Sequence, residues 1–156
     1  MSDVMHTLYD ILHIVGVALF FCGVMTSMLW LFFAEKWRVG ALRTVVKWAR
    51  IINMVITLPG IVLITVSGLF QSPRTGGLFS QSWLVIGLSL FALSVLVWAI
   101  FFTPHLVRLL RIARNPSNPL PVDFFTSLHR LYFYGAIVLI LPLGTMFLSI
   151  FKPILW

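Results

Sequence analysis

Charged residues are scarce in this sequence, and acidic residues are the rarest of them. Only 10% of the 156 residues are charged, with four Asp and Glu against eleven Lys and Arg, whereas 60% are hydrophobic. With a mean hydropathy of +1.05, this composition lies far outside the range of soluble domains. It predicts an integral membrane protein, and we expect no nucleic-acid partner despite the net charge of +7.

Catalytic motifs of hydrolysis and phosphoryl transfer are also missing. The sequence contains no HExxH, no CxxC, no Walker lysine and no pair of carboxylates within an apolar run. Because Cys22 is the single cysteine, an internal disulfide is excluded. These absences leave a membrane haem oxidoreductase as the only enzyme class that we keep open.

Long apolar runs, by contrast, dominate the chain. We expect helices over about residues 9–33, 51–70, 83–114 and 128–151. At 1.5 Å per residue, each of these crosses a hydrocarbon core of about 30 Å. We therefore predict one all-α domain over residues 1–156, a four-helix transmembrane bundle in a lipid bilayer, with a short and partly helical bridge over residues 34–50.

Basic residues gather in two of the three connections between these helices. The connections carry Lys36, Arg38, Arg43, Lys47 and Arg50, and then Arg108, Arg111, Arg114 and Arg130. The positive-inside rule makes both connections cytoplasmic, so both termini are expected outside, in the periplasm of a bacterial inner membrane. The simplest role of these charges is to set the topology and to contact lipid phosphates.

The second run is interrupted by Pro59 and Gly60, which predicts a kink near the middle of the span. Its polar residues Asn53, Thr57 and Thr65 are expected to hydrogen-bond across the bundle or back to freed carbonyls.

The first run carries the main functional clue, a stripe that contains two histidines and is flanked by glycines. The stripe repeats every seven residues, at His6, His13, Phe20 and Ser27, with Gly16 and Gly23 beside it. A histidine in a membrane usually turns toward the protein interior, a cavity or a ligand, and glycines let a helix or a flat ligand approach the backbone. Packing alone and ligand binding are both open at this stripe.

The four histidines fall at two levels, about 20 residues of helix apart, or roughly 30 Å. No single macrocycle spans that distance, so haem b would use one level or the other. The candidate ligands are His13 with His6 or Met146 at the outer level, and His105 with His129 at the inner level, where Arg108 or Arg111 would meet the propionates. Ordinary interfacial hydrogen bonding is the alternative for the inner pair.

Copper is the other metal to consider, because soft and borderline ligands are present. They are Met5, His6, Cys22, Met25, Met28 and Met54. Their spacing predicts no compact cluster, so packing is the simpler role for the methionines.

Three stretches, LHIVGVALFFCG, LPGIVLITVSGL and SWLVIGLSLFALSVLVWAIFFTPHLVRL, resemble the predicted integral membrane family DUF2269. More distantly, they are similar to the four-helix group that includes the copper-resistance CopD domain and the HemJ protoporphyrinogen oxidase. The HemJ resemblance implies b-haem bound by a histidine of the first helix, which His13 matches. It also implies a lysine near the start of the third helix, where this chain has Leu84, Val85, Ile86 and Gly87.

Two functions follow from these patterns. One is a haem-b membrane protein of electron-transfer or porphyrin-related type, with His13 as the first axial ligand. The other is a cofactor-free membrane subunit that packs in a larger complex or forms a homodimer through its glycine face, with all four histidines structural. Copper handling ranks third.

Overall fold

The computed structural model describes residues 2–36, 42–71, 77, 81–114 and 121–151, and within these ranges every secondary-structure element is a helix. The elements are α1 (Ser2–Lys36), α2 (Leu42–Ile52), η2 (Asn53–Thr57), α3 (Leu58–Gln71), α4 (Ser82–Val97), η4 (Trp98–Phe102), α5 (Thr103–Arg114) and α6 (Val122–Phe151). Four continuous helices are long and apolar enough to cross a membrane: Val4–Phe33, Leu42–Gln71, Ser82–Arg114 and Val122–Phe151. The predicted four-helix transmembrane bundle is confirmed.

Three of the helices begin six or more residues earlier than predicted, the first of them at Ser2 instead of about residue 9. The second starts at Leu42 and the fourth at Val122, so most of the expected bridge over residues 34–50 belongs to the second helix. The reason is amphipathicity: one face of α2 buries Leu42, Val45, Val46 and Ala49, and burial of that apolar face keeps the basic segment helical beyond the apolar run.

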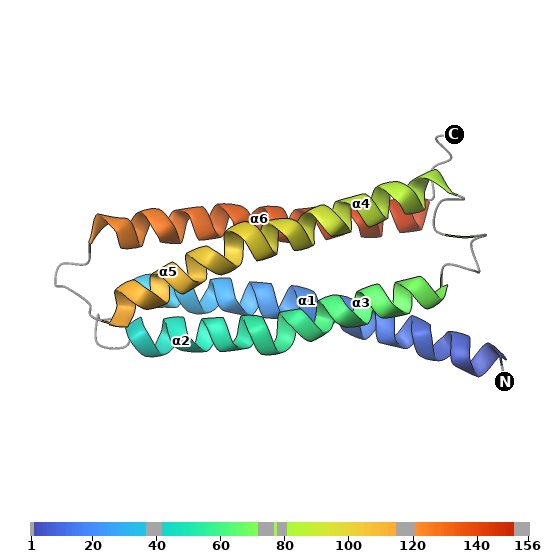
Figure 1. The fold of residues 1–156 in the computed structure, drawn as a ribbon, viewed down its shortest axis with the longest axis horizontal. Coiled ribbons are helices and arrows are strands. Elements are labelled where there is room, and N and C mark those ends of the chain that lie inside the picture. The colour runs from blue at the N-terminus through green and yellow to red at the C-terminus, as the bar shows by residue number, and fades with distance from the viewer. Residues whose placement is uncertain (1, 37–41, 72–76, 78–80, 115–120, 152–156) are drawn as a thin grey trace.

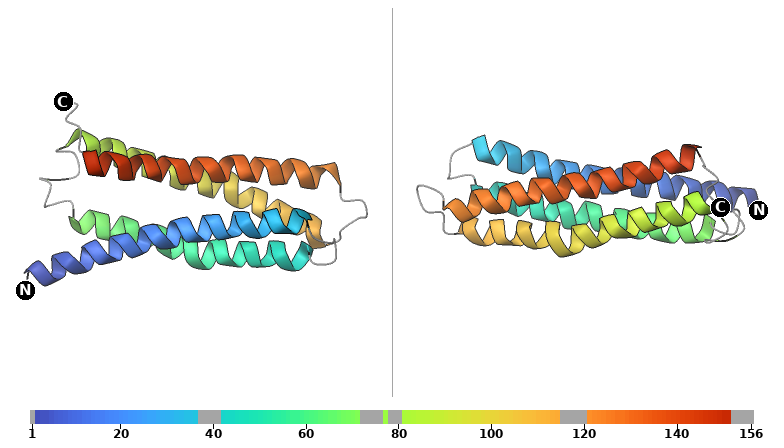
Figure 2. Two further views of the ribbon diagram at one scale, coloured as in Figure 1. Left: turned by 180° about the vertical axis from the view of Figure 1, so that it is seen from behind. Right: turned by 90° about the horizontal axis from the view of Figure 1, so that it is seen from above.

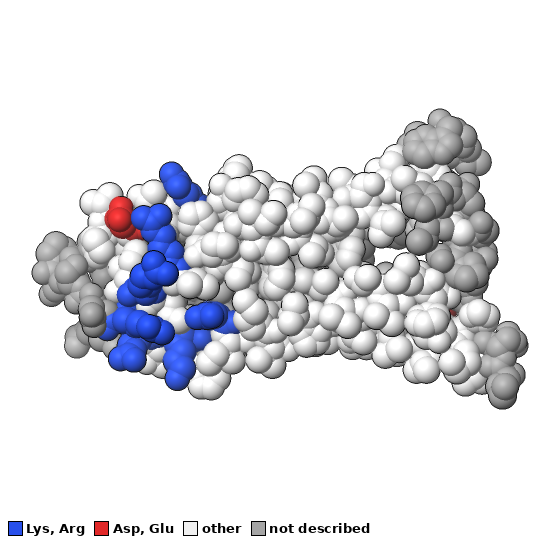
Figure 3. Space-filling view, in the orientation of Figure 1, with Lys and Arg blue, Asp and Glu red and all other residues white. Residues whose placement is uncertain are grey.

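The helices form two antiparallel pairs. The first is α1 against the continuous helix α2–η2–α3, and the second is α4–η4–α5 against α6. The pairs meet where α2 packs on α5 and α1 on α6, and they diverge toward the end at which α1 begins and α6 ends (Figures 1 and 2). We call this the terminal end. The opposite end, where the exposed Lys and Arg side chains gather, is the basic end (Figure 3).

Most of the packed core lies in the middle and at the basic end. Its fully buried side chains there include Leu31, Val46, Phe102, Leu106, Leu109, Phe124 and Leu128. In the space-filling view the surface is notched between the two pairs toward the terminal end (Figure 3). The two pairs are therefore held together chiefly by side chains of the basic half.

Small residues let the helices of each pair approach closely. In the first pair, a Cβ added at Gly60 would lie 2.6 Å from the backbone nitrogen of Phe20, and one at Gly16 would lie 2.9 Å from that of Ile64. In the second pair, Ser94 donates to the Val138 carbonyl at 2.8 Å and Thr145 to the Gly87 carbonyl at 3.1 Å. Close backbone contact and interhelical hydrogen bonds replace the hydrophobic effect, which does not drive helix association in lipid.

Candidate functional site

His13 lies at the terminal half of α1, and its imidazole reaches α3. Its Nδ1 lies 3.1 Å from the hydroxyl oxygen of Ser67. Ser67 is buried and already donates its only hydroxyl hydrogen within its own helix, chiefly to the carbonyl of Leu63. Because that hydrogen is used, Ser67 can only accept from the imidazole. With the Ser67 hydrogen directed to the Leu63 carbonyl, this hydrogen bond places the His13 proton on Nδ1 and leaves a lone pair on Nε2.

Contacts one turn away on either helix hold this imidazole in place. Tyr9 stacks on Phe70 with ring centroids 4.8 Å apart and planes 7° from parallel, and Gln71 Nε2 donates to the Tyr9 carbonyl at 3.0 Å. A Cβ added at Gly68 would lie in ordinary contact with the imidazole, 3.8 Å from its Cε1. These contacts hold α1 against α3 on either side of His13, and the hydrogen bond to Ser67 orients its ring.

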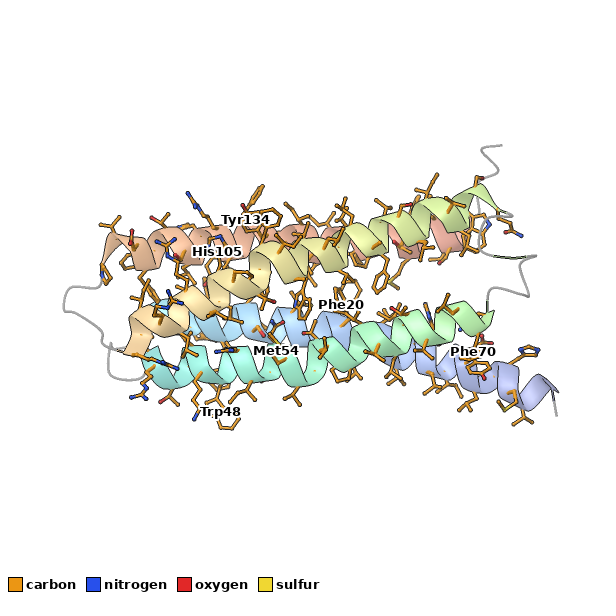
Figure 4. All side chains as sticks on the ribbon, in the orientation of Figure 1. Phe20, Trp48, Met54, Phe70, His105 and Tyr134 are labelled. Atoms are coloured by element: carbon orange, nitrogen blue, oxygen red, sulfur yellow. The ribbon has the colours of Figure 1, made fainter. Side chains whose placement is uncertain are left out.

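His13 lies on the stripe of α1 that continues to Phe20, and its imidazole packs against α3. Phe20 lies seven residues further along the same face, and its ring meets that of Phe91 on α4 edge to face, with centroids 6.2 Å apart. Figure 4 shows Phe20 in the middle of the bundle. His13 lies beyond Phe20 toward the terminal end, where the pairs diverge, and it is half-buried.

The two glycines beside the stripe are covered by another helix. Gly16 faces α3, and a Cβ added at Gly23 would lie 2.3 Å from Thr57 Oγ1 of η2. Of the two alternatives raised by the sequence, helix approach is therefore the one observed at these glycines. Both glycines are buried against the second helix of the same chain.

The remaining outer candidates do not contact His13. His6 is half-buried one heptad before it on α1, and Met146 is 44% exposed on α6, in the other helix pair. Among the described residues no three His, Cys, Asp or Glu side chains lie close enough to hold a metal ion together. The outer level thus offers one oriented imidazole, with no second protein ligand in contact with it.

The two inner histidines do not face each other. His105 stacks on Tyr134 of α6, with centroids 5.6 Å apart, and Phe101 stacks on the same tyrosine at 4.9 Å (Figure 4). His129 lies five residues before Tyr134, about 140° around the helix at 100° per residue. Its Nδ1 donates to the Phe125 carbonyl of its own helix at 2.8 Å, and its side chain is exposed. The described geometry brings His105 to Tyr134 and leaves His129 on another face.

The two arginines expected near haem propionates are both exposed on α5. Arg108 Nη2 lies 3.4 Å from Asp123 Oδ2 at the start of α6, an open ion pair in which both side chains are more than half exposed. Such a pair contributes little to stability. Arg111 lines the same shallow surface as Arg108, outside the helix interfaces.

One comparison with known proteins identifies the chain. The family model DUF2269, described as a predicted integral membrane protein, matches residues 7–153. The chain belongs to this family. No curated protein and no solved structure matches it.

A buried polar contact in this DUF2269 protein connects the two helix pairs at the centre of the bundle. Asn53 Oδ1 accepts from Trp98 Nε1 at 3.0 Å and from Thr57 Oγ1 at 3.1 Å. Asn53 and Thr57 are fully buried and Trp98 is 6% exposed, whereas Asn53 Nδ2 has no partner among the described residues. The expected hydrogen bond of Asn53 across the bundle is confirmed, whereas Thr65 donates back to Ile61 of its own helix.

Trp98 was not among the residues predicted from the sequence to hydrogen-bond across the bundle, although two features mark it. Asn53 and Trp98 each begin a π-helical segment and each lies six positions before a proline, Pro59 and Pro104. A tryptophan in the middle of a span, away from the interfaces where tryptophan is common, also needs an acceptor for its N–H. These two features together would have pointed to a pairing with Asn53.

Proposed function

We propose that this DUF2269 protein binds haem b at the terminal end of its first helix pair, with Nε2 of His13 as an axial ligand. One observation carries the proposal: Nδ1 of His13 lies 3.1 Å from the Ser67 hydroxyl, whose hydrogen is directed to the Leu63 carbonyl, so that the imidazole is the donor to Ser67. Metal-ligating histidines almost always donate the other ring N–H in this way, which fixes the tautomer and the ring orientation. His13 thus has the protonation state that an iron ligand requires.

The surroundings of His13 also suit a large apolar ligand. Its side chain packs against α3 in the half of the bundle where the helix pairs diverge, and the aromatic rings of Tyr9 and Phe70 stack on each other one turn away. Haem bound there would supply one-electron transfer chemistry. The residues of this chain would bind it, hold the ligating ring and surround it with apolar side chains. His6 and Met146 remain the candidates for a second ligand.

The same observation also supports a second candidate function. The hydrogen bond between His13 and Ser67 joins α1 to α3, so the imidazole would also serve a cofactor-free membrane subunit as an interhelical contact. The two functions differ in what they require of Nε2. Haem binding needs its lone pair, whereas helix packing needs only the donor at the position of Nδ1.

A pair of substitutions at His13 separates these functions. Asparagine places an amide N–H near the position of Nδ1 and has no counterpart to Nε2. For the haem protein we expect His13→Asn to remove the Soret band of protein grown with added haem, whereas thermal unfolding, compared between haem-free samples, stays close to wild type. We expect His13→Ala to remove the band and to lower the unfolding free energy by about 0.5–1.5 kcal/mol. His129→Ala, which removes an exposed imidazole, is the matched control and should keep the band.

Absorbance spectra as isolated and after dithionite, with haem and metal analysis, decide the outcome. A wild-type protein that stays colourless after growth with added haem would refute the haem proposal. If wild type binds haem and His13→Asn keeps it, another residue is the ligand. A colourless wild type in which only His13→Ala is destabilised would support the packing function.

We further propose that the protein resides in a bacterial inner membrane with both termini in the periplasm. All seven described Lys and Arg side chains of the connecting segments lie at one end of the bundle, opposite to the start of α1: Arg43, Lys47, Arg50, Arg108, Arg111, Arg114 and Arg130. This asymmetry supports the orientation, because cytoplasmic segments carry an excess of Lys and Arg.

A further inference from the structure

We propose that a groove between α2 and α5 at the basic end binds one anionic phospholipid, with Lys47 and Arg50 on the headgroup phosphate. The groove has a volume of about 320 Å³ and is lined by Lys47, Arg50, Ile51, Met54, Val55 and Leu110. This proposal concerns the opposite end of the molecule from His13 and does not depend on haem.

The lining residues are ordered along the helix as a phospholipid is ordered along its length. Five of the six belong to the second helix at positions 47, 50, 51, 54 and 55, a spacing that places them on one helical face. The two cations come first, at the basic end, and the three apolar residues follow toward the membrane centre. At 1.5 Å per residue the strip is roughly 12 Å long, enough for a headgroup and the first part of an acyl chain.

Among the described residues, no carboxylate neutralises the charge of the groove. Residues 42–71 contain no Asp or Glu, and neither Lys47 nor Arg50 forms an ion pair with a described residue. Arg108, by comparison, is paired with Asp123. Two uncompensated cations above an apolar floor match the charge and polarity of a phosphatidylglycerol-type lipid, and basic pockets between helices on the cytoplasmic side are known to bind such headgroups.

The groove also lies at the headgroup level. Trp48, between the two cations in sequence, is 50% exposed and points away from the bundle, as tryptophans at a membrane interface do (Figure 4). Met54 lies on the side of its helix that faces α5 (Figure 4). Leu110 belongs to the second helix pair, so a lipid in the groove contacts both pairs where they are packed together.

Native mass spectrometry and thermal unfolding of the purified full chain in detergent test this proposal. The probes are phosphatidylglycerol, phosphatidylcholine of the same acyl chains, and inorganic phosphate. Wild type should retain phosphatidylglycerol and unfold at a higher temperature in its presence, with little response to phosphatidylcholine or phosphate. Lys47→Gln combined with Arg50→Gln should weaken phosphatidylglycerol binding roughly tenfold or more, since each cation contributes to headgroup attraction.

The matched control removes the same charge at the same end of the molecule. Arg43→Gln combined with Arg114→Gln changes two exposed cations that do not line the groove, and its affinity should stay within about twofold of wild type. Equal losses in the two double variants would show diffuse attraction to net charge and overturn the proposal, as would undiminished binding to the Lys47/Arg50 variant. Displacement of the lipid by inorganic phosphate would overturn the role of the apolar floor.

Discussion

At the scale of single residues, the contacts made by glycines set the distance between α1 and the second helix. A Cβ at Gly60 would lie 2.6 Å from the Phe20 nitrogen and 2.9 Å from the Gly16 carbonyl oxygen. Both are backbone atoms, which cannot turn away as a flexible side chain can. The absence of a side chain at Gly60 is therefore a requirement of this helix pair.

Gly60→Ala should destabilise the protein, because the helices must separate or shift to admit one methyl group. We expect a loss of about 1–3 kcal/mol in the free energy of unfolding, the usual cost of overpacking, measured by unfolding in mixed micelles. Gly144→Ala is the control: its Cβ would lie 3.5 Å from Leu90 Cδ1, an ordinary contact. Similar losses at the two positions would contradict this account of the first pair.

At the same scale, His13 and His129 differ in their hydrogen-bond partners, although both are histidines near an end of an apolar run. His13 reaches Ser67 in another helix, whereas His129 bonds to the Phe125 carbonyl of its own helix and stays exposed. Of these two histidines, only His13 is therefore oriented by a contact with another helix. This contrast is the physical reason for using His129→Ala as the control in the haem experiment.

At the scale of elements, two helices carry a π-helical segment, and in each case a proline follows. Proline has no N–H to donate and its ring clashes with the carbonyl four residues earlier. In the second and third helices the chain widens over Asn53–Thr57 and Trp98–Phe102, before Pro59 and Pro104. Beside the first segment, Ser27 of α1 shares its one hydroxyl hydrogen between the Gly23 carbonyl of its own helix at 2.7 Å and the Ala49 carbonyl at 3.0 Å. A polar group of a neighbouring helix thus stabilises the irregular stretch, as expected in a membrane.

The first residues of the two π-helical segments are the ones that pair, and this coupling is measurable. Trp98→Phe and Asn53→Leu each remove the hydrogen bond between the helix pairs. In a double-mutant cycle we expect a coupling of about 0.6–1.7 kcal/mol, the range found for interhelical hydrogen bonds in membranes. Unfolding in mixed micelles gives the four free energies. Additive losses would mean that the contact contributes no energy of its own.

At the scale of the whole molecule, the charge asymmetry along the bundle predicts its orientation in the membrane. The described connecting segments carry their Lys and Arg at the basic end, and α1 begins and α6 ends at the other. In a bacterial host, alkaline phosphatase fused after residue 156 should be active and green fluorescent protein fused there should be dark. Fusions after Arg114 should show the reverse pattern. The opposite result at both sites would place the termini in the cytoplasm.

The packing between the two helix pairs also changes along the length of the bundle. At the basic half, α2 packs on α5 and the buried aliphatic core lies between the pairs, whereas at the terminal half the pairs diverge. The proposed haem ligand His13 belongs to the divergent half, and the proposed lipid groove belongs to the joined half. The two proposals therefore concern independent parts of the bundle.

Several features of this protein were already determined by the sequence alone. Transfer of side chains to lipid is a local property, so the apolar runs predicted four spanning helices, and the Lys and Arg positions predicted that the connections carrying them share one end. Pro59 and Gly60 predicted a kink in the second helix, and the structure has a π-helical segment, Asn53–Thr57, just before them. The stripe through His13 was found because a seven-residue spacing places side chains on one helical face.

Only the tertiary structure decided what each face meets. Helical periodicity shows that Gly16, Gly23 and His13 lie near one another on α1, but the helix that covers the glycines and the hydroxyl that accepts from His13 belong to residues more than 30 positions away. The separation of His105 from His129, the pairing of Asn53 with Trp98 and the groove beside Lys47 depend in the same way on how the helices rotate and cross. Those rotations are set by the sum of many small packing contacts between distant segments, and a pattern within one segment does not contain them.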